Sequence, residues 1–316
     1  MRGRLLEIVR AVLAVAVLAA VGIALWRNWD AVSTELGLLP GGAIAASFVL
    51  ALSAPVLTMF GWRVLLRDLG TDLPLPPSAS VFFVGQLGKY VPGSVWSVVA
   101  QAEMGQRLGI PRRRMGVTSL LAIGLSVVWG ALLGVPALPL LLDRSGGAVS
   151  AWWLVPAVIA AVVVLTPRIL SAVIDGLLRL LRRDPLGYAL TGRAVVVTSC
   201  WFALAWLAVG ASVLVLARAL SAGADPSALA LACLSGFPLA GAIGMFSFFL
   251  PAGVGVRDGV LALLLAGLIS PPAAAAVVVV ARFLSVVVDI VLALLGWIWG
   301  RTHHLLGSPS GATGER

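Results

Sequence analysis

Long apolar segments alternate with short polar segments along most of the sequence. Each apolar segment is close to the length of about 20 residues that a helix needs to cross a lipid bilayer. Arginine, aspartate, glutamate and proline gather in the short segments between them. We therefore predict an all-α polytopic membrane protein with about six full transmembrane helices. The six lie at residues 11–25, 42–62, 115–142, 149–166, 194–217 and 273–299.

Two further apolar segments are interrupted by proline and glycine, and we predict that each folds as a re-entrant helical hairpin. Each arm of the first segment is about 20 Å long as a helix, which is shorter than the hydrocarbon core of about 30 Å. Arginines flank this segment on both sides, which favours a hairpin that enters from the cytoplasm and returns there. The arms lie at residues 77–91 and 94–106, and at residues 227–250 and 257–269.

The order of these elements predicts an inverted repeat. Residues 42–142 contain a span, a hairpin that enters from inside and another span, and residues 194–299 repeat this order with a hairpin that enters from outside. Many transporters are built from such repeats. A single transmembrane domain then covers residues 1–300, and residues 301–316 form a polar disordered tail. Residues 168–183 have the spacing of an amphipathic helix on the inner membrane surface.

Composition supports a membrane protein and narrows its partners. Of the 316 residues, 60% are hydrophobic and 11% are charged, whereas soluble domains carry about 25% charged residues, so a soluble fold is excluded. The net charge of +9 is typical of arginines that follow the positive-inside rule, and it indicates membrane lipids and not nucleic acid as partners. We expect the cytoplasmic (inner) membrane, with both termini cytoplasmic and residues 27–40 as a short outer loop.

We predict no cofactor, metal site or catalytic motif. Cys200 and Cys233 lie in separate apolar runs, and both histidines, His303 and His304, lie in the polar tail. These positions give no metal-ligand spacing and no histidine within the membrane. The apolar run 11–25 resembles a signal peptide but lacks a small-residue cleavage region, so we interpret it as a retained helix.

The hinge of the first hairpin is a candidate anion site. Lys89 is the only lysine of the chain and precedes the break at Pro92 and Gly93. The helix that restarts at Ser94, with Trp96 in its first turn, would direct free N–H groups towards the hinge. A lysine beside a helix N-terminus suits a phosphate or a carboxylate. The alternative is a lysine that extends to the inner membrane surface and binds nothing.

The hinge of the second hairpin follows the same pattern. Pro251, Gly253 and Gly255 interrupt the apolar segment, and Arg257 and Asp258 fall in the first turn of the next helix. An aspartate suits the positive end of a helix, whereas an arginine does so only with an anion nearby. The alternative is a loop at the outer surface whose arginine contacts lipid headgroups.

A polar stripe runs along the last predicted helix. Arg282, Ser285 and Asp289 are spaced by three and four residues, which places them on one helix face. Charges at this depth need a partner in the bundle interior or in a wet cavity. Glu103, in the returning arm of the first hairpin, is the remaining deep acid and a candidate partner for Lys89. The alternatives are ion pairs of these charges, within the helix or with another helix, that only fix packing, and a Glu103 near the inner surface.

Together these candidate residues form a neutral set. A neutral set leaves open a zwitterionic ligand, an anion offset by protons, or no ligand at all. The cations are Lys89, Arg257 and Arg282, and the carboxylates are those of Glu103, Asp258 and Asp289.

At these residues the sequence resembles the lysylphosphatidylglycerol synthase transmembrane (flippase-like) family, which includes the flippase domain of the bacterial multiple peptide resistance factor. The resemblance covers about residues 10–300. It is carried by Gly-Lys-Tyr-Val-Pro-Gly-Ser-Val-Trp-Ser at 88–97, Arg-Leu-Gly-Ile-Pro at 107–111, Pro-Ala-Gly-Val-Gly-Val-Arg-Asp at 251–258, and the pair Arg282 and Asp289.

The resemblance implies a lipid-translocating domain with re-entrant helices. The family commonly has Glu after the arginine of its second block, where this chain has the shorter Asp258. The multiple peptide resistance factor continues into an aminoacyl-transferase domain, whereas this sequence ends at Arg316, so we expect no aminoacyl-lipid synthesis by it. The residues that match the two family blocks are Lys89, Pro92, Gly93 and Trp96, and Pro251, Gly253, Gly255, Arg257 and Asp258.

The leading hypothesis is a flippase or transporter that moves a phospholipid or a polyprenyl-phosphate-linked lipid and meets an anionic headgroup at the inner leaflet. One alternative is a membrane-embedded lipid-linked transferase, for which the spacing of Asp68 and Asp72 is the only hint. Another is a non-transporting partner of envelope synthesis machinery. Association as a homo-oligomer or with an envelope-synthesis enzyme is open.

Overall fold

A computed structural model describes residues 29–91, 95–142, 190–221, 223–245 and 255–302, with a few isolated positions outside these ranges. Within this part of the chain every regular element is a helix, as the sequence predicts. Five helical stretches are long and apolar enough to cross a membrane, so the protein is a multi-pass membrane protein. They are Gly41–Asp68, Arg112–Leu141, Gly192–Ala219, Pro226–Met245 and Pro271–Thr302.

Four of the predicted spans appear as helices. They are α3 (Gly41–Asp68), α6 (Arg112–Gly134) with its extension through η2 (Val135–Ala137) and α7 (Leu138–Leu142), α10 (Gly192–Ala219) and α14 (Pro271–Thr302). The predicted spans 11–25 and 149–166 fall almost entirely outside the described residues, as do the predicted surface helix 168–183 and most of the tail 301–316.

The connection predicted over residues 27–40 is not an irregular loop, because α2 (Trp29–Leu38) forms a helix there, and its position on the outer side stays a prediction. Val32 is buried on its inner side, and α2 packs against α14. Contact with a neighbouring helix stabilises this short segment where the spacing of polar residues alone suggests a loop. Pro40 is the N-cap residue of α3.

Both predicted hairpin segments are broken helices. The first consists of α4 (Leu75–Gln86), the 3-10 turn η1 (Leu87–Tyr90) and α5 (Trp96–Arg107). The second consists of α11 (Pro226–Leu234), α12 (Gly236–Met245) and α13 (Val256–Leu265). Because α11 and α12 together are long enough to span a membrane, the re-entrant path of these segments and the number of full spans stay predictions.

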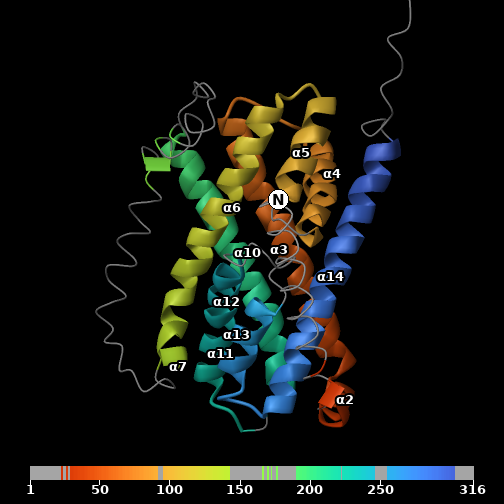
Figure 1. The fold of residues 1–316 in the computed structure, drawn as a ribbon, viewed down its shortest axis with the longest axis vertical. Coiled ribbons are helices and arrows are strands. Elements are labelled where there is room, and N and C mark those ends of the chain that lie inside the picture. The colour runs from red at the N-terminus through yellow and green to blue at the C-terminus, as the bar shows by residue number, and fades with distance from the viewer. Residues whose placement is uncertain are drawn as a thin grey trace, which may run out of the picture.

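The helices of the two halves exchange partners. In the centre of the bundle α3 packs along α10, and the carboxylate of Asp68 at the end of α3 accepts hydrogen bonds of 2.8 Å from the N–H and the hydroxyl of Thr191. Around this centre, α4 of the first half packs against α14 of the second, and α12 of the second half packs against α6 of the first (Figure 1). This reciprocal packing is what an inverted repeat requires, although the repeat units 42–142 and 194–299 stay a prediction.

Two apolar clusters hold the bundle together. One surrounds Trp62, Phe82 and Met115 and joins α3, α4, α6 and α10. The other surrounds Leu216 and Leu265 and joins α10 to the second hairpin segment and α14. Each broken segment is thereby fixed against full-length helices. This packing fixes the described residues on both sides of each break.

Candidate functional site

Charged residues from both hairpin segments meet α14. Figure 1 shows α14 running along the bundle, with α4 beside its upper part and α13 beside its lower part. Arg282 and Asp289 lie on this helix, two turns apart. Both face the bundle interior and not the lipid, since the Asp289 side chain is only 7% exposed and that of Arg282 only 20%. The sequence prediction of an inward-facing charged stripe is therefore confirmed for these two residues.

The first hairpin segment contributes two groups to Asp289. The ammonium of Lys89 lies 2.7 Å from Oδ2 of Asp289, and the hydroxyl of Tyr90 donates a hydrogen bond of 2.5 Å to the same oxygen. The 3-10 turn η1 presents both side chains on the side of α14. Gly88 permits this turn to approach the start of α5, because a Cβ there would collide with the backbone of Trp96 and Ser97.

The predicted pairing of Glu103 with Lys89 is wrong. Glu103 pairs instead with Arg112, and both side chains are about half exposed. The physical reason is the tight turn between α5 and α6, in which Gly109 adopts a positive φ of 76° and Pro111 begins the next helix. This turn brings Arg112 back beside Glu103. The alternative, a Glu103 near the inner membrane surface, stays a prediction, and the half-exposed pair with Arg112 agrees with it.

The second hairpin segment contributes Arg257 and Asp258. The Asp258 carboxylate lies 3.3 Å from Nη2 of Arg257 and 3.9 Å from Nη1 of Arg282, and it accepts the N–H of Gly255 at 3.3 Å. It therefore closes the first turn of α13 while it faces two guanidinium groups. Gly255 has φ of 86°, a conformation that strains any residue with a side chain. The Arg257 guanidinium also lies 5.3 Å from the centre of the Phe237 ring.

The two groups of charges form one site, which we call the α14 cluster: Lys89, Tyr90, Arg257, Asp258, Arg282 and Asp289. Arg257 and Arg282 both lie within electrostatic range of the Tyr90 hydroxyl, which links the two groups. Without Glu103 the formal charge is no longer neutral. Three cations face two carboxylates, which leaves a charge of +1.

Several predicted site residues lie elsewhere or cannot be placed. Pro92, Gly93, Ser94, Pro251 and Gly253 fall outside the described residues. Trp96 begins α5 and is 47% exposed, and the hydroxyl of Ser285 donates to the carbonyl of Ala281 in its own helix at 2.8 Å.

Sequence reasoning missed Tyr90 and Phe237. Tyr90 is one of two tyrosines in the chain and directly follows the single lysine, which is the available signal. Nothing in the pattern distinguishes Phe237 from other apolar residues of its helix. Tyr90 contacts Asp289, which is 199 residues away in the sequence, and Phe237 contacts Arg257 in the next helix of the same segment.

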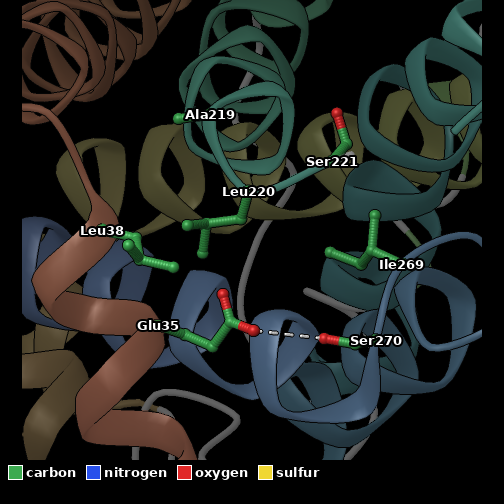
Figure 2. Close-up of a pocket in the computed structure, with 7 residues that line it drawn as sticks. All are labelled: Glu35, Leu38, Ala219, Leu220, Ser221, Ile269 and Ser270. Carbon is green, nitrogen blue, oxygen red and sulfur yellow. Dashed lines mark hydrogen bonds between the residues drawn. The ribbon is translucent and has the colours of Figure 1, made fainter. Parts of the chain in front are cut away.

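A cavity of about 430 Å³ lies away from the α14 cluster, where α2 meets the end of α10 and the turn between α13 and α14. Figure 2 shows the Glu35 carboxylate directed towards Ser270, whose hydroxyl donates a hydrogen bond of 3.4 Å to it. None of the predicted site residues lines this cavity. Its lining residues are Glu35, Leu38, Ala219, Leu220, Ser221, Ile269 and Ser270.

Comparison with known families agrees with the resemblance seen in the sequence. The model of the family described as "Lysylphosphatidylglycerol synthase TM region" matches residues 9–293, which is most of the chain. All residues of the α14 cluster lie within the matched range. No curated protein matches this chain.

Proposed function

This chain belongs to the lysylphosphatidylglycerol synthase TM region family, and we propose that it translocates an amphiphile with a charged headgroup across the cytoplasmic membrane. The substrate would be a phospholipid or a polyprenyl-phosphate-linked lipid. The observation that carries this proposal is the α14 cluster. It assembles charges from two broken helical segments on one helix of an otherwise apolar bundle.

Charged side chains within a membrane protein cost free energy, so their presence there indicates a function. A charged side chain in the middle of a membrane helix costs about 2.5 kcal/mol or more, and an apolar pair of the same size packs at least as well. The Lys89 side chain is 37% exposed, and those of Arg257 and Arg282 are each 20% exposed. A cluster that only fixed packing would not need accessible cations. Accessible cations on broken helices are suited to a polar headgroup that must be held briefly and released.

We propose a transport role and not an enzymatic one. The acids that a lipid-linked transferase would use hold other contacts: Asp68 accepts hydrogen bonds from Thr191, and Asp72 lies 3.5 Å from Arg67 and 3.8 Å from Arg63. These contacts join helix ends and give the two acids a structural role. A metal-dependent turnover that Asp68→Asn abolishes would favour the transferase.

The direct test is lipid translocation in reconstituted vesicles. Purified protein is placed in vesicles that contain a labelled phosphatidylglycerol, and the loss of label from the outer leaflet is followed over time. We expect Arg257→Ala and Arg282→Ala each to slow translocation by at least about tenfold, because each removes a charge-assisted contact. Arg301→Ala is the matched control, since Arg301 lies on α14 but stacks on Trp297 outside the cluster.

Two outcomes would contradict the proposal. If wild-type protein does not accelerate translocation of any lipid across a broad panel, the chain is better explained as a non-transporting partner of envelope synthesis machinery. If both arginine variants match the wild type, the α14 cluster is not part of the path.

We further propose that both termini are cytoplasmic. We also propose that the protein contacts anionic headgroups at the inner leaflet, where homo-oligomers or an envelope-synthesis enzyme would be its protein partners.

A further inference from the structure

The cavity beside α2 is lined by one carboxylate and, among its seven described residues, by no basic side chain. The lining comprises the Glu35 carboxylate, the hydroxyls of Ser221 and Ser270, and four apolar residues, so it does not itself neutralise the carboxylate. The cavity is separate from the α14 cluster. Arg282, the cluster member nearest to this end of α14, lies about three turns beyond the start of the helix at Pro271.

The Glu35 carboxylate has capacity for further hydrogen bonds. The Ser270 hydroxyl donates to one of its oxygens at 3.4 Å, whereas O–H···O hydrogen bonds are usually about 2.5–3.0 Å long, so this contact is weak. A carboxylate has about four acceptor sites. Figure 2 shows the second oxygen directed away from Ser270, towards the apolar side chain of Leu220. A cation bound beside this oxygen would stabilise the ionised carboxylate among its apolar neighbours.

The helix end at the cavity also favours a cation. Leu220 is the C-cap residue of α10, so the negative end of the dipole of this 28-residue helix lies at the cavity. The Ser221 hydroxyl donates to the carbonyl of Arg218 at 3.1 Å, and its oxygen can still accept a hydrogen bond. The positive end of α14 is capped by Ser270, which accepts the N–H of Ala273 at 3.3 Å.

We infer that this cavity binds a primary alkylammonium ion. The ammonium group, which has three N–H donors, would donate to the Glu35 carboxylate. The alkyl part would pack against Leu38, Leu220 and Ile269. The volume of about 430 Å³ suits a small molecule, since such sites measure about 300–1,000 Å³. Leu38 is 62% exposed, so the cavity is open at the surface of the bundle.

The lining favours a primary ammonium over other cations. Proteins commonly recognise quaternary ammonium groups with aromatic rings, and none of the seven lining residues is aromatic. Calcium takes about six to eight oxygen ligands, whereas this lining offers one carboxylate and two hydroxyls from side chains. A primary ammonium needs only a few acceptors and an apolar surface for its chain. The cavity supplies both.

The binding test is isothermal titration calorimetry on the full-length purified protein in detergent. The three probes share a butyl chain and differ in the polar group: butylammonium, butan-1-ol and butyltrimethylammonium. We expect butylammonium to bind at least about tenfold more tightly than each of the other two. Butan-1-ol lacks the charge, and butyltrimethylammonium lacks the N–H donors, so only butylammonium forms charge-assisted hydrogen bonds with the carboxylate.

An ammonium group can belong to a free amine or to a lipid headgroup, and two further probes distinguish these sources. Lysophosphatidylethanolamine carries a primary ammonium on a lipid, and lysophosphatidylglycerol lacks it. Tighter binding of lysophosphatidylethanolamine than of butylammonium would assign the ammonium to a lipid, and weaker binding would assign it to a free amine. Lysophosphatidylglycerol should not displace butylammonium in either case, and displacement would overturn the inference.

Variants locate the site within the protein. Glu35→Gln keeps the size of the side chain but removes its charge, so it should weaken butylammonium binding by at least about tenfold. Asp30→Asn is the matched control, because Asp30 is an exposed acid of the same helix that does not line the cavity. Ala219→Leu leaves every charge in place and fills part of the cavity, so it should also weaken binding several-fold. This variant keeps the test decisive if Glu35→Gln fails to fold.

The outcomes that would overturn the inference are specific. Equal binding of butylammonium and butan-1-ol, or a folded Glu35→Gln that binds butylammonium as the wild type does, would show that Glu35 only links α2 to the start of α14. Tighter binding of butyltrimethylammonium than of butylammonium would overturn the choice of a primary ammonium. The inference goes beyond lipid translocation, so a negative result in the vesicle assay leaves it intact.

Discussion

The helices α6 and α14 each pack against a broken segment of the other half, α6 against α12 and α14 against α4. The two interfaces differ in polarity. Where α6 meets α12, glycines allow very close contact: a Cβ at Gly134 would lie 2.7 Å from Cα of Leu239, and one at Gly130 would lie 3.2 Å from the carbonyl oxygen of Pro238. From Met115 to Gly134, α6 has no charged residue. Where α14 meets α4 and α13, the interface contains the charges of the α14 cluster. The interface of α6 with α12 is therefore a tight apolar contact, whereas the interface of α14 with α4 and α13 is polar and partly accessible.

Under the proposed function, this difference suggests different tasks for the two sides of the bundle. Small residues four positions apart bring helices into close van der Waals contact, and such interfaces are costly to separate. Polar residues within a membrane bundle mark paths and binding sites. We therefore expect α6 and α12 to move as one unit and the headgroup to pass along α14.

The largest effect is expected when the close contact of α6 is disturbed. Gly134→Val would place side-chain atoms against the backbone of Leu239 and should lower the free energy of unfolding by about 3 kcal/mol. The matched control is Gly124→Val on the same helix, because a Cβ at Gly124 meets nothing within 4 Å. Thermal unfolding in detergent checks this prediction. Equal losses in the two variants would mean that the interface is not tightly packed.

A smaller effect is expected when the polar interface loses its buried acid. Asp289→Ala leaves the Lys89 ammonium and the Tyr90 hydroxyl without their acceptor and should destabilise the protein by about 2 kcal/mol. Glu103→Ala breaks the exposed pair with Arg112 and should cost less than about 1 kcal/mol. Unfolding measurements on both variants compare a buried with an exposed ion pair. A larger loss for Glu103→Ala would contradict the assignment.

The hydroxyl of Tyr90 provides a finer test of the same interface. Tyr90→Phe removes one hydrogen bond of 2.5 Å and leaves the ring in place, so we expect a loss of about 1 kcal/mol in unfolding free energy. In the Asp289→Ala background the same substitution should have little effect, because the acceptor is already gone. Additive losses in the double variant would show that the two side chains do not interact.

Long helices and hinge positions were predictable from the sequence, whereas contacts across the bundle were not. The spans α3, α10 and α14 follow from apolar runs that no pattern of turn residues interrupts, and even Pro55 does not break α3. Tyr90 and Asp289 are separated by 199 residues, so their contact depends on how η1 lies against α14. No periodicity in the sequence predicts this contact between Tyr90 and Asp289.

The incorrect partner of Glu103 has a local cause. Spacing along α5 places Glu103 in the returning arm, but the choice between Lys89 and Arg112 depends on the turn at Gly109. That turn returns the chain within nine residues, and a nearby arginine then competes well with a lysine at the other end of the arm. A helical hairpin with a short turn favours ion pairs across the turn, which is a rule that sequence analysis could have applied.

The smallest predicted effect lies at the start of α11, outside the α14 cluster. The carboxylate of Asp225 accepts from the Ser227 hydroxyl at 2.6 Å and from the N–H of Ala228 at 3.0 Å, and these hydrogen bonds lower the pKa of Asp225. Since the ionised form is favoured in the folded state, its stabilisation is present above the unfolded pKa of about 3.9 and is lost as the pH falls through the lower folded pKa. Asp225→Ala should therefore be slightly less stable than the wild type at pH 7.

The pH dependence provides the control for this cap. The small difference between Asp225→Ala and the wild type should shrink as the pH falls below about 3.9, whereas Asp225→Asn should retain a cap that does not titrate. Unfolding curves at several pH values check this. A difference that stays constant with pH would show that the carboxylate charge does not contribute.

The position of α14 between both broken segments has a mechanical consequence. Lys89 and Asp258 belong to different halves of the chain, yet each forms an ion pair with the same 32-residue helix α14. Lys89 pairs with Asp289 of this helix, and Asp258 pairs with Arg282. A shift of α14 along its axis by one turn, about 5.4 Å, would separate both ion pairs in a single step. The contacts of the two broken segments are therefore mechanically coupled through α14.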